Sequence, residues 1–207
     1  MSEGVFFYPR KMGRIILLGM EEVMDINGVD ALLQLAPLED FIQKPSPAAA
    51  SQPIAFEKIS LLQSTLEQAY GPRGGRGLAL RVGRACFKYG LKEYGSMLGL
   101  TETAFRLLPL PAKLYTGAKV FADLFNKHTD QKVRVEEKDN NILWHIDQCP
   151  LCWNRKADEP ICHLAVGLLQ EALYWVSGGK VFNVEETACI ARGDKSCTIT
   201  MDQTPLS

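Results

Sequence analysis

Five of the six cysteines are grouped near the C-terminal end of the chain, where their thiolates are well suited to bind a metal ion. These five are Cys149, Cys152, Cys162, Cys189 and Cys197. Cys86 stands apart from them. In a reducing compartment, clustered cysteines indicate metal binding rather than disulfides. Because a structural zinc site takes four tetrahedral ligands from short loops and turns, the grouping favours zinc.

Two local arrangements can each supply a pair of thiolates. Residues 149–152 form a CxxC motif at the exit of an expected strand, and Cys189 and Cys197 are eight positions apart across an expected hairpin. With residues 192–194 as the turn, the two Cβ atoms of that hairpin pair are about 4.5 to 5.5 Å apart. Cys162 supplies another thiolate at the first turn of an expected helix. Five thiols then compete for four places.

Glu186 is a further candidate ligand. Alternation along its strand places it on the same face as Val184 and Ala188, where an unpaired carboxylate is costly, so it should have a partner. Glu186 and Cys189 are three positions apart and would point to opposite faces of a regular strand. If both bind one ion, we expect a β-bulge between them.

Two other interpretations of the thiols stay open. Buried reduced cysteines can act simply as small hydrophobes. Four thiolates can also hold an iron–sulfur cluster, although two of the ligands would then lie on a regular hairpin rather than in looped cysteine runs. The arrangement favours a structural zinc ion over both.

Composition indicates a globular protein without a polyanionic partner. Apolar residues make up 46% of the 207 residues, and 23 Lys and Arg balance 24 Asp and Glu. We therefore expect no nucleic-acid partner. The apolar run over residues 15–20 is too short for a signal-peptide core or a membrane span, which predicts a cytoplasmic protein.

Hydrophobic periodicity predicts helices first and a sheet afterwards. We expect helices at 11–24, 28–35, 56–70, 78–98, 101–108, 112–128 and 161–177, with a turn at 71–77. We expect hairpins that pair 132–136 with 141–147 and 181–191 with 195–201. The fold class is therefore α+β: an antiparallel sheet built from two β-hairpins, packed against a helix bundle, with an N-terminal helical extension.

A segment rich in Pro and Ala at residues 41–56 suggests a domain boundary. We expect an N-terminal helical extension and linker at 1–52 and a ligand-binding domain at 53–207. The zinc-binding core of that domain is expected at 131–202.

The stretch from Lys132 to Met201 resembles the vinyl-4-reductase domain. The residues that carry the resemblance are Cys149, Pro150, Cys162, His163, Gly167, Glu185, Glu186, Cys189, Gly193 and Cys197. That domain is named for bacteriochlorophyll 4-vinyl reductase and occurs in the ligand-sensing parts of aromatic-responsive transcription activators. Its fold is shared with trafficking-complex subunits and haem nitric-oxide-binding domains. The resemblance implies a small-molecule-binding α+β fold that is often dimeric.

The resemblance also implies a ligand set for the zinc ion. In the aromatic-sensing relatives, zinc is held by a Cys before the last helix and by the pattern E-x2-C-x7-C. Carried onto this sequence, the ligands are Cys162, Glu186, Cys189 and Cys197. Cys152 departs from the pattern as an extra thiol, so Cys149 or Cys152 can replace Glu186 here.

An apolar stripe on the last helix begins at the expected metal site, since Cys162, Val166, Leu169 and Leu173 follow at steps of four, three and four. It faces apolar residues of the strands and of the preceding helix, as either solid core or cavity wall. The resemblance favours a cavity. The expected ligand-binding residues are Trp144, Ile142, Ile146, Val166, Leu169, Leu173, Val184, Tyr115 and Phe121.

These expectations together predict a zinc-stabilised binding protein for a small hydrophobic ligand. The resemblance suggests a tetrapyrrole of the (bacterio)chlorophyll pathway as ligand, a role as carrier, sensor or assembly factor, and a homodimer. One alternative is a tetrapyrrole 4-vinyl reductase that takes electrons from a partner, since the sequence has no dinucleotide-binding fingerprint. A second alternative is an interaction module that holds a lipid. No catalytic residue is assigned.

Overall fold

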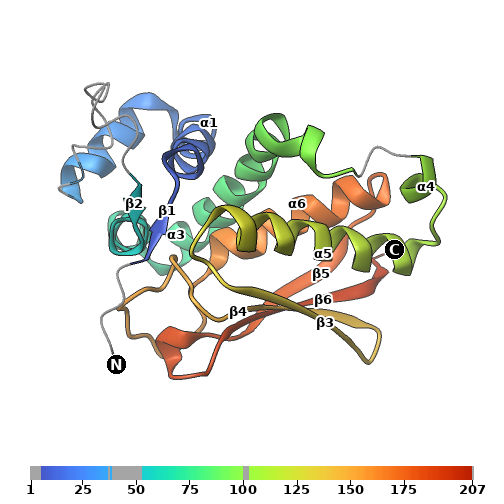
Figure 1. Ribbon diagram of the computed structural model, residues 1–207. Coiled ribbons are helices and arrows are strands. Elements are labelled where there is room, and N and C mark those ends of the chain that lie inside the picture. Colours follow the sequence, from blue (N-terminus) through green and yellow to red (C-terminus); the bar gives the residue numbers. More distant parts are fainter. Residues whose placement is uncertain (1–5, 37, 39–52, 100–102, 207) are drawn as a thin grey trace.

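A four-stranded antiparallel sheet, with helices packed on one face, positions the cysteines (Figure 1). The computed structural model describes residues 6–36, 38, 53–99 and 103–206. The strand order is β3-β4-β6-β5. Both predicted hairpins are present, and the two inner strands, β4 and β6, come from different hairpins.

The strands follow the predicted alternation. Their bounds are β3 Val133–Lys138, β4 Asn141–Ile146, β5 Phe182–Ala188 and β6 Cys197–Pro205. Every second residue of β4 is buried, beginning at Ile142. The turn between β3 and β4 places Asp139 and Asn140 at φ 50° and 62°, as a tight hairpin requires.

Helices make up the rest of the described structure. Their bounds are α1 Arg10–Leu35, α3 Phe56–Tyr94, α4 Thr103–Arg106, α5 Leu110–His128 and α6 His163–Ser177, with the 3-10 turns η2 Gly95–Met97 and η3 Ile190–Arg192. Two short strands, β1 Phe7–Tyr8 and β2 Ile54–Ala55, pair before α1 and α3. The α+β class is confirmed.

The predicted helix breaks exist but are shorter than expected. In α1 the break lies at Asp25 (φ 61°), whose Oδ1 accepts the Gly28 N–H at 3.0 Å. In α3 it lies at Gly71 (φ 72°), and the helix resumes at Pro72. The predicted turn over residues 71–77 was therefore too long, because proline fits the first turn of a helix and glycine alone needed the left-handed conformation.

The helices form successive layers on the sheet. Helices α5 and α6 lie against the strands, α3 packs on α6, and α1 packs on α3 (Figure 1). Two glycines allow the backbones of α3 and α6 to touch. A Cβ atom at Gly83 would lie 2.1 Å from the Leu164 carbonyl oxygen, and one at Gly167 would lie 2.0 Å from that of Leu80.

One hydrophobic core connects the N-terminal helix to the sheet. It runs from Tyr8 and Met12, through α3 and α6, to Ile199 and Met201 of β6. Residues 39–52, which hold most of the predicted linker, lie outside the described residues. The predicted extension shares its core with the rest of the chain, and the division at residue 52 stays a prediction.

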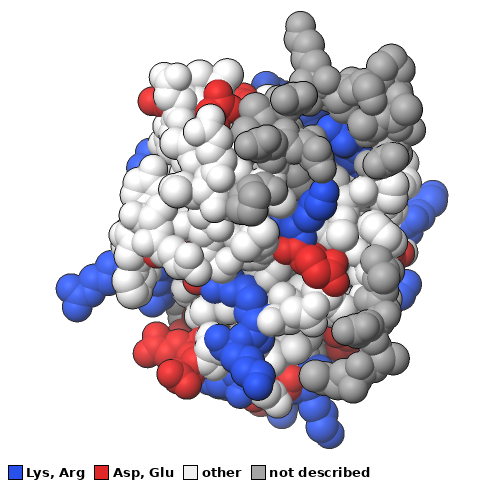
Figure 2. Space-filling model, turned by 90° about the vertical axis from the view of Figure 1, so that its left-hand side faces the viewer, with Lys and Arg blue, Asp and Glu red and all other residues white. Residues whose placement is uncertain are grey.

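The surface of the described part is mixed in charge where Figure 2 shows it. Lysine and arginine side chains there are interspersed with aspartate and glutamate, without a broad field of one sign. Within the described ranges, every helix is too short or too polar to cross a membrane.

Candidate metal centre and adjoining cavity

Five buried thiols from four separate segments meet at one end of the sheet. Cys149 and Cys152 lie in the loop after β4, and Cys162 is the N-cap residue of α6. Cys189 precedes η3, and Cys197 begins β6 opposite Ile146 of β4. The fold therefore gathers the whole predicted cysteine group.

The distances between the sulfur atoms match a zinc–thiolate site. Cys162 Sγ lies 3.5, 3.9 and 3.7 Å from the Sγ atoms of Cys149, Cys189 and Cys197. Cys197 Sγ lies 3.3 Å from that of Cys152 and 3.8 Å from that of Cys189. Tetrahedral zinc with Zn–S bonds of about 2.3 Å places its sulfurs about 3.8 Å apart. The cluster can therefore hold a metal ion.

Two overlapping sets of four donors are formed. One set is Cys149, Cys152, Cys162 and Cys197, and the other is Cys162, Glu186, Cys189 and Cys197. Within each set all ligand atoms lie within 4.8 Å of one another. The structure thus brings together both the ligand set implied by the resemblance and the two alternates.

Glu186 has the partner that its position required. Its Oε2 accepts the backbone N–H of Cys162 at 2.6 Å, while its buried Oε1 has no hydrogen-bond partner. Burial, aided by the nearby Cys189 thiolate, raises the pKa of Glu186 to about 8. The register shifts between Glu186 and Ala188, so the predicted bulge is confirmed.

The thiols share their protons unequally. Cys149 raises the pKa of Cys152, but hydrogen bonds with the other three thiols outweigh this and lower it to about 6. Cys152 likewise raises the pKa of Cys189, and bonds with Cys162 and Cys197 lower it to about 6. Hydrogen bonds to the neighbouring thiolates, Cys149 first, and then burial raise the pKa of Cys162. Some donors are thus stabilised as thiolates near neutral pH before any metal binds.

The connection between β5 and β6 differs from the predicted three-residue turn. Residues 190–192 form η3, and Gly193 follows at φ 101°. The Cys189 N–H donates to Asp194 Oδ2 at 2.9 Å, and the Ile190 N–H donates to Cys197 Sγ at 3.3 Å. Cys189 lies just beyond the strand pairing, so these backbone bonds, rather than a regular hairpin, hold it beside Cys197.

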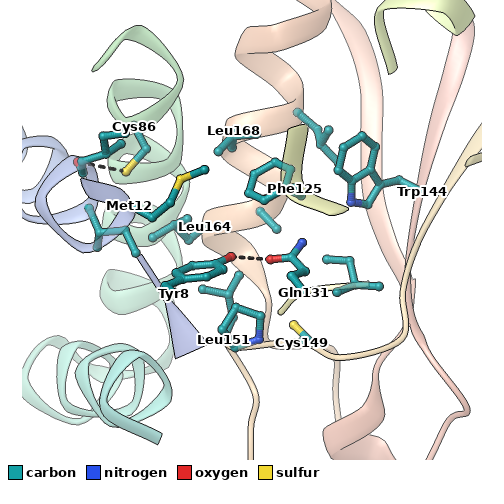
Figure 3. A pocket seen from close by; sticks show the side chains of 16 residues that line it. Tyr8, Met12, Cys86, Phe125, Gln131, Trp144, Cys149, Leu151, Leu164 and Leu168 are labelled. Carbon is teal, nitrogen blue, oxygen red and sulfur yellow. Dashed lines mark hydrogen bonds between the residues drawn. The ribbon is translucent and has the colours of Figure 1, made fainter. Parts of the chain in front are cut away.

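An apolar cavity of about 60 Å³ adjoins the cluster (Figure 3). Cys149, Pro150 and Leu151 form one wall, so the CxxC segment borders the cavity and the metal centre alike. Among the predicted ligand-binding residues, those that line it are Trp144, Ile146 and Leu169. Phe125, Leu164, Ala165 and Leu168 also contribute to the lining.

The other predicted ligand-binding residues lie outside this lining. They are Ile142, Val166, Leu173, Val184, Tyr115 and Phe121. All but Tyr115 are buried in the core, where Phe121, for example, packs edge-on against Phe87 at 5.4 Å between ring centroids. The cavity lies beside a neighbouring stripe of α6 that faces α1.

Sequence reasoning missed the N-terminal wall of the cavity. Tyr8, Met12, Ile15 and Ile16 line it from β1 and α1. The signal was present in the sequence, since the last three residues follow helical spacing on one apolar face. Treating residues 1–52 as a separate extension removed that face from consideration.

The cavity contains one polar pair. The Tyr8 hydroxyl donates to Gln131 Oε1, and both side chains are buried (Figure 3). Burial, with the nearby Cys149 thiolate, raises the pKa of Tyr8, so the phenol stays protonated. A ligand would find a hydroxyl group there and otherwise apolar surface.

Cys86 lines the opposite side of the cavity, away from the metal cluster. Its thiol lies 3.7 Å from the Ile15 carbonyl oxygen, and burial raises its pKa to about 12. Because the thiolate is the reactive form, we expect Cys86 to stay unmodified by iodoacetamide at pH 8 in the native protein. Peptide mass spectrometry checks this. Labelling as fast as in urea would contradict the described packing.

Comparison with known families matches part of the chain. Residues 144–202 match the family model of the vinyl-4-reductase domain. An uncharacterised protein of Methanocaldococcus jannaschii is 28% identical over 108 residues, which cover 52% of this chain and 57% of that protein. The chain thus spans little more than half the length of this curated relative.

Solved structures of H-NOX proteins share the fold over nearly the whole chain. An Fe(II) H-NOX protein from S. oneidensis, a triple mutant, aligns with a TM-score of 0.60 at 11% identity, covering 95% of each chain. An unliganded Fe(II) H-NOX protein from K. algicida aligns with a TM-score of 0.53 at 13% identity, covering 94% of this chain and 96% of that one. At such identities the likeness establishes the fold alone.

Proposed function

Because residues 144–202 of this chain form a vinyl-4-reductase domain, we propose that the protein is a zinc-stabilised binding protein for a small apolar ligand. The observation that carries the proposal is the shared wall at residues 149–151, which borders both the cysteine cluster and the apolar cavity. A metal ion there would fix the segments that enclose the ligand.

Zinc is the metal that best fits the donors. The sulfur spacings agree with tetrahedral zinc–thiolate geometry, and both donor sets lie inside the protein. Four protein ligands leave no open position for water, so such an ion would be structural. Its role would be to link the start of α6 to the loop after β4 and to the β5–β6 connection.

The cavity fits a ligand smaller than a tetrapyrrole. Its volume of about 60 Å³ lies well below the roughly 300 Å³ at which sites for drug-sized molecules begin. Haem also needs an axial ligand, and none of the three histidines lines this cavity. His128 stacks beside Tyr94, His145 lies on β4 bonded to Thr198, and His163 begins α6. The described residues therefore do not fit haem.

Filling the cavity should abolish binding of a small apolar probe. Ala165 lines it from α6, so Ala165→Leu places three additional carbon atoms in that space. We expect at least a tenfold loss of affinity for xenon, measured by xenon-129 NMR, and for benzene, measured by thermal shift. Glu171→Leu on the same helix, outside the cavity lining, is the matched control and should bind as the unaltered protein does.

The same assay tests the proposed ligand size. A graded series of xenon, benzene, indole and protoporphyrin should show binding that ends as probe size increases. Stoichiometric binding of protoporphyrin would contradict the size limit, and failure of every probe to bind would contradict the ligand-binding function.

A further inference from the structure

The metal-binding donors outnumber the places at one ion. Five thiols and one carboxyl group form two sets of four, and both sets contain Cys162 and Cys197. The Sγ atoms of these two cysteines lie 3.7 Å apart, which is the edge length of a zinc–thiolate tetrahedron. The two sets are therefore two tetrahedra that share one edge.

Either tetrahedron alone would leave buried donors without a partner. An ion in the set with Cys149 and Cys152 leaves Cys189 unbound and leaves the buried Glu186 Oε1 unsatisfied. An ion in the other set leaves the fully buried Cys149 and Cys152 without metal. Buried polar atoms normally have partners, so the unsatisfied Glu186 oxygen points to a ligand at its own end of the cluster.

Charge and coordination numbers agree with two ions. Two four-coordinate ions need eight bonds, and six donors supply eight when two of them bridge. Six anionic donors would exceed the charge of one zinc ion by four and that of two zinc ions by two. Because a buried charge without compensation is costly, the second ion relieves the larger imbalance.

We propose that the cluster holds two zinc ions bridged by the thiolates of Cys162 and Cys197, one completed by Cys149 and Cys152 and the other by Glu186 and Cys189. The inference extends the proposed function, because it requires that the cluster binds zinc at all. The second ion would add the CxxC wall of the cavity to the same metal centre that holds η3 and the start of β6.

Native mass spectrometry of the full chain, purified with zinc in the medium, measures the stoichiometry directly. We expect two zinc ions per chain. Cys152→Ala and Cys189→Ala should each keep one, because each removes a ligand specific to one tetrahedron. Cys86→Ala lies outside the cluster and should keep two. One ion in the unaltered protein would overturn the two-ion inference and leave the proposed zinc site intact, whereas none would overturn both.

Cobalt substitution tests the bridges without any variant. Two cobalt(II) ions joined by bridging thiolates couple magnetically, so the electron paramagnetic resonance signal should rise to an intermediate point of the titration and fall by more than half at two equivalents. A signal that grows in proportion to cobalt up to two equivalents would overturn the bridged arrangement. So would saturation of the thiolate-to-cobalt absorption at one equivalent.

Discussion

Replacement of Cys197 by alanine is expected to remove zinc from the purified protein and to lower its Tm by about 10 °C or more. Cys197 belongs to both donor sets, so neither tetrahedron survives the change. Structural zinc contributes about 10 kcal/mol or more to the folding of small zinc domains, and this chain also has its own hydrophobic core. A loss of about 5 kcal/mol corresponds to a decrease of roughly 10 to 20 °C at this size.

Calorimetry and metal analysis by mass spectrometry measure these two effects. Cys86→Ala is the matched control, because it removes an equally buried thiol that lies outside both donor sets. The control should keep its zinc. A Cys197→Ala protein with the full zinc content would contradict the assignment of this residue as a ligand.

Replacement of Gly83 by alanine should destabilise the protein by about 3 kcal/mol, or roughly 6 to 12 °C in Tm. The new Cβ would lie 2.1 Å from the Leu164 carbonyl oxygen and 2.7 Å from the Leu168 backbone nitrogen. Both obstacles are backbone atoms, so α3 and α6 would have to move apart. Because Leu164 and Leu168 line the cavity, affinity for the xenon probe should also change.

Gly77→Ala provides the control within the same helix. An added Cβ at Gly77 meets no atom within 4 Å, and alanine is the better helix former by about 1 kcal/mol. This variant should be as stable as the unaltered protein or slightly more stable. Equal destabilisation by both substitutions would show that helix propensity, rather than the close contact with α6, determines the effect.

The parts of the fold that depend on local patterns could be predicted from the sequence. Alternation and turn residues located both hairpins, and the CxxC motif with the E-x2-C-x7-C spacing located the cysteine cluster. The bulge after Glu186 followed from parity, because a carboxylate and a thiol three positions apart can share an ion only if the strand is irregular.

Features that depend on contacts distant in sequence could not be predicted. Hydrophobic periodicity shows that α1 has an apolar face, but not that this face closes a cavity against α6 and Trp144. The sequence likewise does not show that Gly83 and Gly167 bring two backbones into contact. Each depends on how helices far apart in the sequence are arranged, which periodicity alone does not determine.

The position of the cluster relates metal binding to ligand binding. The CxxC segment has zinc donors at both ends and contributes Cys149, Pro150 and Leu151 to the cavity wall. The N-cap position of Cys162 fixes the start of α6, whose next turns line the same cavity. Loss of metal should therefore weaken binding of the apolar probes as well as stability.

Zinc X-ray absorption spectroscopy of the purified protein tests the central claim most directly. If the cysteine cluster is a zinc centre, the first coordination shell should be dominated by sulfur at about 2.3 Å, with a minor oxygen contribution from Glu186. A shell made of nitrogen and oxygen alone, or a protein purified without zinc, would contradict it.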